Sequence, residues 1–139
     1  MGTDGSAFSE IPTRECWDRL RSEAYGRLAV TGPEGPMIYP VNAIVDHGAI
    51  VFRTNEGGKL DAMRADPRVA FEVDGWEPAA SMAWSVLITG TAEEITRMRE
   101  GSEMTELGLT PWQAGPKPTY IRIVPSTITG RTFIRTAGG

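Results

Sequence analysis

The chain has 139 residues, one cysteine, one histidine and a net charge of −4 at pH 7. This is enough for one domain with its own core, and it excludes a disulfide framework, a cysteine-rich zinc module and any site that needs two imidazoles. The acidic balance argues against nucleic-acid binding, and no segment reaches the roughly 20 apolar residues of a membrane span. Without a visible secretory signal, we expect a cytoplasmic protein.

The first residues predict a tail followed by a helix. Residues 1–10 are small and polar, which is typical of a flexible tail, and a single domain is expected over 11–135. Pro12 and Thr13 are typical of a helix start, and apolar residues follow them at helical spacing. Gly26 is expected to end this helix.

From residue 27 onward, apolar residues recur at every second position, which predicts strands. The predicted strands cover 27–31, 37–45, 49–53, 68–74, 84–91 and 120–124, with an extension over 128–134. Further helices are predicted over 59–65 and 93–107. Pro40 lies inside the second strand and implies a sheet edge or a bulge there, because proline cannot donate to a strand ladder. Hairpin-connected strands with peripheral helices predict a mainly β fold, a closed or split antiparallel barrel.

The segment from Phe52 to Lys59, FRTNEGGK, combines the groups that bind phosphate. An arginine ends a buried strand, two glycines bend the backbone, and a lysine opens a helix. Guanidinium, exposed amides, a helix N-terminus and an ammonium group all favour an anion. It is not a Walker A loop, because Arg53 stands at the first glycine position and Leu60 replaces the serine or threonine. A plain strand-to-helix turn with solvated basic residues explains the same pattern equally well.

Two other strand positions are candidates for ligand contact. Pro40 leaves neighbouring backbone groups free to meet a ligand, and Asn42 offers both a donor and an acceptor. Ser85 places a hydroxyl at the start of a buried strand. An edge strand protected from aggregation and a satisfied strand serine are the alternatives. His47 is interpreted as a turn residue and Cys16 as a small buried apolar residue.

Taken in order, these segments resemble the pyridoxamine 5'-phosphate oxidase-like family of flavin-binding split barrels, most closely its short actinobacterial-type members. The similarity runs from about Cys16 to Arg131. The matching pieces are Gly26-Arg27-Leu28-Ala29, Tyr39-Pro40-Val41-Asn42, Ile50-Val51-Phe52-Arg53-Thr54, Gly58-Lys59-Leu60, Pro67-Arg68-Val69-Ala70-Phe71-Glu72-Val73-Asp74, Trp84-Ser85-Val86 with Gly90, and Ile128-Thr129-Gly130-Arg131.

The resemblance implies a six-stranded Greek-key split barrel, a homodimer, and FMN in a groove shared by both subunits. By position, the Arg53-Thr54 segment and Lys59 would hold the phosphate and ribityl chain, and Ser85 would contact the ring or phosphate. Arg131 would approach from near the C-terminus. The implied cofactor-binding residues are Tyr39, Pro40, Val41, Asn42, Phe52, Arg53, Thr54, Gly58, Lys59 and Ser85, with no metal site.

The chain also departs from the vitamin-oxidising members. The segment 127–135 has no histidine or tryptophan where those enzymes bind the substrate phosphate, so oxidation of pyridoxamine phosphate is not expected. The first hypothesis is an FMN-dependent oxidoreductase with an unidentified small substrate, whose hydride chemistry belongs to the flavin. The second is a reductase that uses the deazaflavin coenzyme on the same fold. The third is a non-catalytic flavin-binding module.

Overall fold

The structure is a computed structural model, and it describes residues 7–23, 25–95 and 118–134. Its strands are β1 (Ala7–Glu10), β2 (Tyr25–Gly32), β3 (Gly35–Asp46), β4 (Ala49–Thr54), β5 (Arg68–Glu77), β6 (Met82–Glu94) and β7 (Thr119–Ile134). Its helices are α1 (Thr13–Ser22), α2 (Gly58–Ala65) and the 3-10 turn η1 (Pro78–Ala80). Every strand pairing among the described residues is antiparallel.

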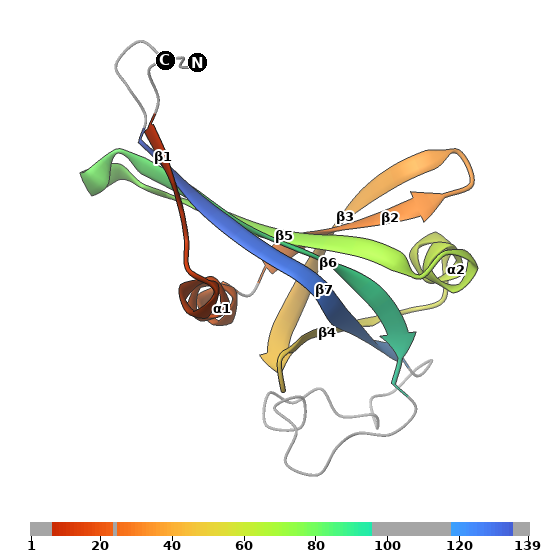
Figure 1. The fold of residues 1–139 in the computed structure, drawn as a ribbon. Coiled ribbons are helices and arrows are strands. Elements are labelled where there is room, and N and C mark those ends of the chain that lie inside the picture. The colour runs from red at the N-terminus through yellow and green to blue at the C-terminus, as the bar shows by residue number, and fades with distance from the viewer. Residues whose placement is uncertain (1–6, 24, 96–117, 135–139) are drawn as a thin grey trace.

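The strands form one sheet that closes on itself. Their order is β1-β7-β4-β3-β2-β5-β6, and the additional pairing of β7 with β6 joins the ends into a ring of six strands with β1 attached outside it. Figure 1 shows the long β5, β6 and β7 side by side, with α1 and α2 at opposite ends of the molecule. The predicted six-stranded antiparallel split barrel with peripheral helices is confirmed.

The barrel core comes from the alternation of side chains along each strand. Leu28, Phe52, Phe71 and Ile88 are at most 2% exposed and all point inward. Each apolar side chain of this size contributes roughly 1.5–3 kcal/mol when it is fully buried. Cys16 and Leu20, one helical turn apart on α1, and Leu60 and Met63 on α2 join the same core cluster.

The opposite side of these strands forms a continuous surface, which we call the outer face. Its positions are fixed by the ladder, because directly paired residues point to the same side of a sheet. Pro40 pairs with Arg27, Arg27 with Glu72, Glu72 with Leu87, and Leu87 with Thr129. The outer face comprises Tyr25, Arg27, Ile38, Pro40, Asn42, Glu72, Asp74, Ser85, Leu87, Thr129 and Arg131. Tyr25 and Ile38 are 71% and 69% exposed on it.

Two predictions near the N-terminus need correction. The expected tail is wrong for Ala7–Glu10, because these residues pair with β7 as strand β1. Helix α1 ends at Ser22, and Gly26 lies inside β2 instead of ending the helix. This glycine is required by packing, because a Cβ atom there would overlap the Phe71 ring.

The end of β6 also differs from the prediction. The helix expected over 93–107 does not begin at Glu93, because β6 continues through Glu94 and pairs with β7. Residues 96–107 of that predicted helix lie outside the described residues. The edge position inferred from Pro40 is confirmed. The residues of β3 before Ala43 pair with β2 on one side, and among the described residues no strand pairs with them on the other, because β4 pairs with β3 only over Ala43–Asp46.

Candidate functional site

The turn between β4 and α2 places Lys59 in the first turn of a helix. Gly57, the residue before this helix, has φ 153° and no side chain that caps it. That backbone conformation is one that L side chains rarely adopt, so the glycine is required locally. The helix N-terminus therefore keeps backbone N–H groups available for an anion.

Lys59 is held against Tyr39 of β3. Its Nζ lies 5.4 Å from the centroid of the Tyr39 ring, close enough for a cation–π interaction. A Cβ added at Gly58 would lie 3.9 Å from the Tyr39 hydroxyl, so the ring also borders the turn. Burial lowers the pKa of Lys59. The structure thus brings Tyr39, Gly58 and Lys59 together; we call them the lysine corner.

The lysine corner carries positive charge that no carboxylate of the described residues neutralises. Most described basic residues form ion pairs, among them Arg27 with Glu72 and Asp74, and Arg64 with Glu56 and Glu94. Within the described ranges, the basic residues without a carboxylate partner are Arg14, Arg53, Lys59 and Arg131. Three of these are residues that the sequence analysis selected for ligand contact. An unpaired cation beside free backbone amides is suited to an anionic ligand.

The remaining predicted phosphate-binding residues, at the end of β4, point to opposite sides of the strand. Phe52 is 1% exposed and Thr54 is 8% exposed, both on the inner side. Thr54 Oγ1 donates to the Asn55 carbonyl at 3.3 Å. Arg53 points to the other side of the strand and is exposed. Phe52 is therefore a core residue, and only its backbone is available to a ligand.

The segment 39–42 alternates in the same way. Tyr39 faces the lysine corner, and the Val41 side chain is 6% exposed in the core. Pro40 and Asn42 lie on the outer face and are exposed. The backbone of this segment has the open edge described above, so it remains available to a ligand even where its side chains are buried.

Ser85 lies in a different place, on the outer face. It borders a cavity of about 380 Å³ that Glu72, Leu87, Thr129, Arg131 and Phe133 also line. Burial, together with the neighbouring Asp74, raises the pKa of Glu72, and Arg27 acts against this shift. The cavity has a hydroxyl, a carboxylate and a guanidinium group around an apolar centre, a composition typical of a small-molecule site.

The predicted residues therefore form two parts on opposite sides of the sheet. Tyr39 and Lys59 lie on one side, whereas Ser85 and Arg131 lie on the outer face. The sequence analysis did not detect that Glu72 belongs beside Ser85. The alternation of 68–74 placed Glu72 opposite the core, but only the strand order shows that β5 and β6 are neighbours.

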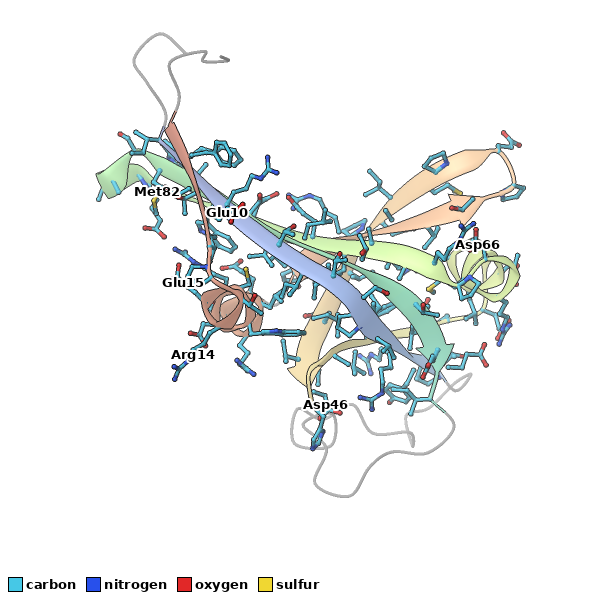
Figure 2. The ribbon with its side chains drawn as sticks, in the orientation of Figure 1. Glu10, Arg14, Glu15, Asp46, Asp66 and Met82 are labelled. Carbon is cyan, nitrogen blue, oxygen red and sulfur yellow. The ribbon has the colours of Figure 1, made fainter. Side chains whose placement is uncertain are left out.

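The single histidine, His47, lies beside the buried carboxylate of Asp46. His47 Nδ1 lies 3.0 Å from Asp46 Oδ1, and the Asp46 carboxylate is fully buried with Arg122 3.5 Å away. Figure 2 labels Asp46 at the end of β3. No group of three potential metal ligands occurs within residues 7–23, 25–95 and 118–134. In these ranges there is also no helix of the length and apolarity that a bilayer crossing requires.

Known proteins are similar to this chain in sequence and in fold. The profile of the pyridoxamine 5'-phosphate oxidase family matches residues 12–132. An uncharacterized Mycobacterium tuberculosis protein, Rv0080, is 32% identical over 126 residues, which cover 87% of this chain and 82% of that protein.

Two solved structures are similar over nearly the whole chain. A Corynebacterium glutamicum protein, provisionally named as a pyridoxamine 5'-phosphate oxidase, is 36% identical with a TM-score of 0.73, covering 97% of this chain and 99% of that one. The FAD binding protein from Mycobacterium smegmatis is 31% identical with a TM-score of 0.68, covering 91% and 99% of the two chains.

Proposed function

Because this chain belongs to the pyridoxamine 5'-phosphate oxidase family, we propose that it binds FMN and acts as an oxidoreductase on a small substrate. The observation that carries this proposal is the lysine corner, where an ammonium group lies beside a helix N-terminus, and neither a carboxylate partner nor a side-chain cap is found for them among the residues that the structure describes. A phosphate monoester carries charge and acceptor oxygens that match these donors. The name of the similar Mycobacterium smegmatis protein supports a flavin ligand.

The residues present fit the phosphate end of FMN. Lys59 supplies a point charge, and Gly57 and Gly58 leave the helix amides open. We assign Arg53 to the phosphate as a second cation because, although its side chain leaves the opposite side of β4, it lies at the strand end, where a ligand can reach around the edge. When bound, FMN supplies hydride transfer to or from the substrate. The protein's part is to hold the phosphate and to present polar groups to the ring, which we assign to the backbone of 39–42 and to Ser85.

We propose that the complete site needs two copies of the chain. The lysine corner and Ser85 lie on opposite sides of one sheet, so a single flat ligand does not reach both within one subunit except around an edge. The outer face carries exposed Tyr25, Ile38 and Leu87, apolar side chains suited to contact with a second copy. The proposal is therefore a homodimer with the flavin groove at the subunit interface.

A cytoplasmic location belongs to the same proposal. Cys16 is a free, buried thiol, which suits a reducing compartment.

The visible spectrum of the purified protein tests the cofactor assignment. We expect a yellow protein that releases FMN on heating, identified by chromatography against FMN and FAD standards. The apoprotein should bind FMN more tightly than riboflavin, because only FMN carries the phosphate that Lys59 and Arg53 are proposed to hold. A colourless protein that binds deazaflavin coenzyme but not FMN would contradict the proposal in favour of the deazaflavin alternative. Flavin bound without turnover of any tested acceptor would favour a non-catalytic module.

A mixing experiment tests the shared groove. Lys59→Met removes one half of the proposed site and Ser85→Leu the other, so neither variant should bind FMN well alone. If the halves come from different subunits, refolding the two variants together should restore about a quarter of the wild-type sites, because half the dimers are mixed and each has one intact groove. No recovery from a mixture that forms dimers would contradict a groove built from both subunits.

A further inference from the structure

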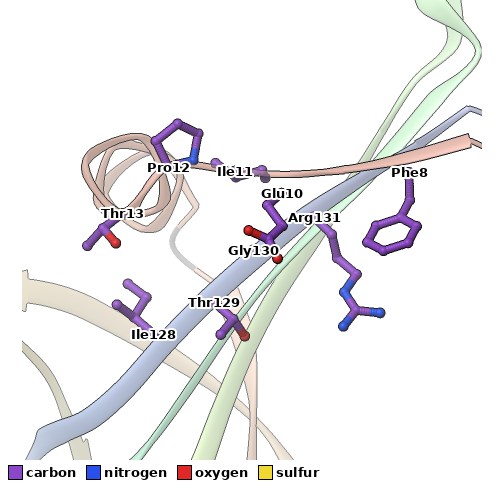
Figure 3. Close-up of a pocket in the computed structure, with 9 residues that line it drawn as sticks. All are labelled: Phe8, Glu10, Ile11, Pro12, Thr13, Ile128, Thr129, Gly130 and Arg131. Carbon is purple, nitrogen blue, oxygen red and sulfur yellow. The ribbon is translucent and has the colours of Figure 1, made fainter.

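A second cavity lies at the junction of β1, α1 and β7, next to the one that contains Ser85. Its volume is about 460 Å³, within the range of about 300–1,000 Å³ that small-molecule sites occupy. Arg131 and Thr129 line both cavities. Figure 3 shows four of the residues that line it, Phe8 and Glu10 from β1 and Thr129 and Arg131 from β7.

Arg131 is oriented by an aromatic ring instead of by a carboxylate. Its guanidinium carbon lies 5.3 Å from the centroid of the Phe8 ring. An arginine stacked on a ring keeps its in-plane N–H groups free, and these fit the two oxygens of one carboxylate. Phe8 itself is 59% exposed, so it also offers apolar area to a ligand.

Glu10 gives the cavity a second polar group. It is the direct ladder partner of Arg131, yet the two side chains form no ion pair, and neither has a carboxylate or basic partner elsewhere in the described part of the chain. A carboxylate accepts from an O–H or N–H group of a ligand. It also disfavours a doubly charged phosphate so close to a single guanidinium.

The end of the cavity away from Phe8 and Arg131 is apolar (Figure 3). Ile11, Pro12 and Ile128 line it, and Ile128 packs against the barrel core. A ligand that fits all of these surfaces has a flat apolar body, one carboxylate and one hydroxyl or amine group.

We infer that this cavity binds the substrate as a planar aromatic carboxylate with a ring hydroxyl or amine, held by Arg131 over Phe8 with its donor toward Glu10. In this role the inference rests on the oxidoreductase function proposed above, because the cavity adjoins the one that contains Ser85. It adds a substrate class, which neither the family nor the similar proteins specify for this chain.

The test uses 4-hydroxybenzoate as probe, titrated calorimetrically into the full-length protein with and without saturating FMN. The uncharged 4-hydroxybenzamide is the ligand control. We expect the acid to bind at least tenfold more tightly than the amide, the scale of a hydrogen bond to a charged group. Equal affinities for the two compounds, or no saturable binding of the acid, would overturn the inference without any need for a variant.

Two variants locate the binding. Arg131→Met keeps an apolar stem over Phe8 and should weaken the acid about tenfold while leaving the amide almost unchanged. Arg14→Met is the matched control, because Arg14 is also an exposed arginine without a carboxylate partner, and Figure 2 shows it on α1 pointing away from the barrel. Equal effects of the two substitutions would overturn the assignment to Arg131.

The outcome is separable from the fate of the flavin proposal. FMN affinity is measured by flavin fluorescence in the absence of the probe, and it depends on the lysine corner. Charge-selective probe binding by a protein that does not bind FMN would refute the proposed function but keep the aromatic-acid site. FMN binding without charge-selective probe binding would refute the inference alone.

Discussion

Replacing Lys59 with methionine separates charge from packing at the lysine corner. Methionine keeps a flexible apolar stem against Tyr39 and removes only the ammonium group, which lies 5.4 Å from the ring centroid. We expect FMN binding to weaken strongly while the fold remains intact. Alanine would also remove the stem and would mix the two effects.

The size of the loss follows from the environment of the ammonium group. Lys59 is half-buried and has no carboxylate partner among the residues that the structure describes, so a bound phosphate does not compete with a protein anion. A hydrogen bond to a charged group contributes about 1.5–3 kcal/mol, which corresponds to roughly a tenfold to hundredfold rise in the FMN dissociation constant. Riboflavin has no phosphate, and its affinity should change less than twofold.

The pH dependence has a defined sign. Burial holds the pKa of Lys59 below its usual value of 10.5, so the ammonium group loses its proton earlier as pH rises. FMN affinity should therefore fall on the alkaline side, starting below the pH at which an ordinary lysine titrates, and the methionine variant should lack this fall. In the free protein the buried charge costs stability at neutral pH, and this cost is lost as pH rises from the lowered folded pKa to the unfolded value of 10.5. The free variant should accordingly be at least as stable as wild type.

The assay is fluorescence titration of FMN, accompanied by urea unfolding of each free protein. Arg14→Met is the control for the removal of an exposed cation, and its FMN affinity should match wild type. The reasoning is refuted if Lys59→Met binds FMN within twofold of wild type, or if it loses FMN and riboflavin affinity equally. A large loss of stability in the free variant would show that the side chain supports the fold instead of the ligand.

Three further substitutions probe the scaffold. Gly57→Ala forces a side chain into φ 153° and should cost about 1–3 kcal/mol of unfolding free energy. Gly58→Ala should cost less than half as much, because a Cβ atom there has only the Tyr39 hydroxyl within 4 Å. Urea unfolding compares the two variants, and equal costs would contradict the strain argument. Arg122→Met leaves the fully buried Asp46 carboxylate without this guanidinium and should destabilise by about 3 kcal/mol, again by urea unfolding, with a loss under 1 kcal/mol counting against a role for the pair.

The sequence predicted the parts of the fold that local periodicity determines. The alternation of Val69, Phe71 and Val73 gave the inward face of β5, and the Asp66-Pro67 boundary gave the end of α2. The glycine-lysine turn was also located from local chemistry, because the groups that form it are adjacent in the chain. Tyr39 was assigned through the family resemblance, and it meets Lys59 although the two residues lie on different elements, β3 and α2.

The sequence failed where long-range pairing decides. Ala7–Glu10 is polar and short and has no strand signal of its own, yet the long β7 provides a free edge on which it becomes β1. The continuation of β6 through Glu94 depends on β7 in the same way. Because β1 was not predicted from the sequence, the second cavity was not predicted either. Phe8 and Glu10 reach Arg131 only through the pairing of β1 with β7.

The alternation of side chains along the strands limits where a ligand-binding side chain can lie. In a barrel of hairpins, each strand presents one side to the core, so ligand-binding side chains must come from turns, strand ends or the outward side. The lysine corner is a strand end followed by a turn, and Ser85, Glu72 and Arg131 lie on the outward side. In the proposed function, one groove contacts both the lysine corner and the outward-facing residues, and a single barrel does not supply all of its walls. The proposed homodimer accounts for both the exposed apolar residues of the outer face and the described cations that have no carboxylate partner, because it places the two parts of the site in one groove.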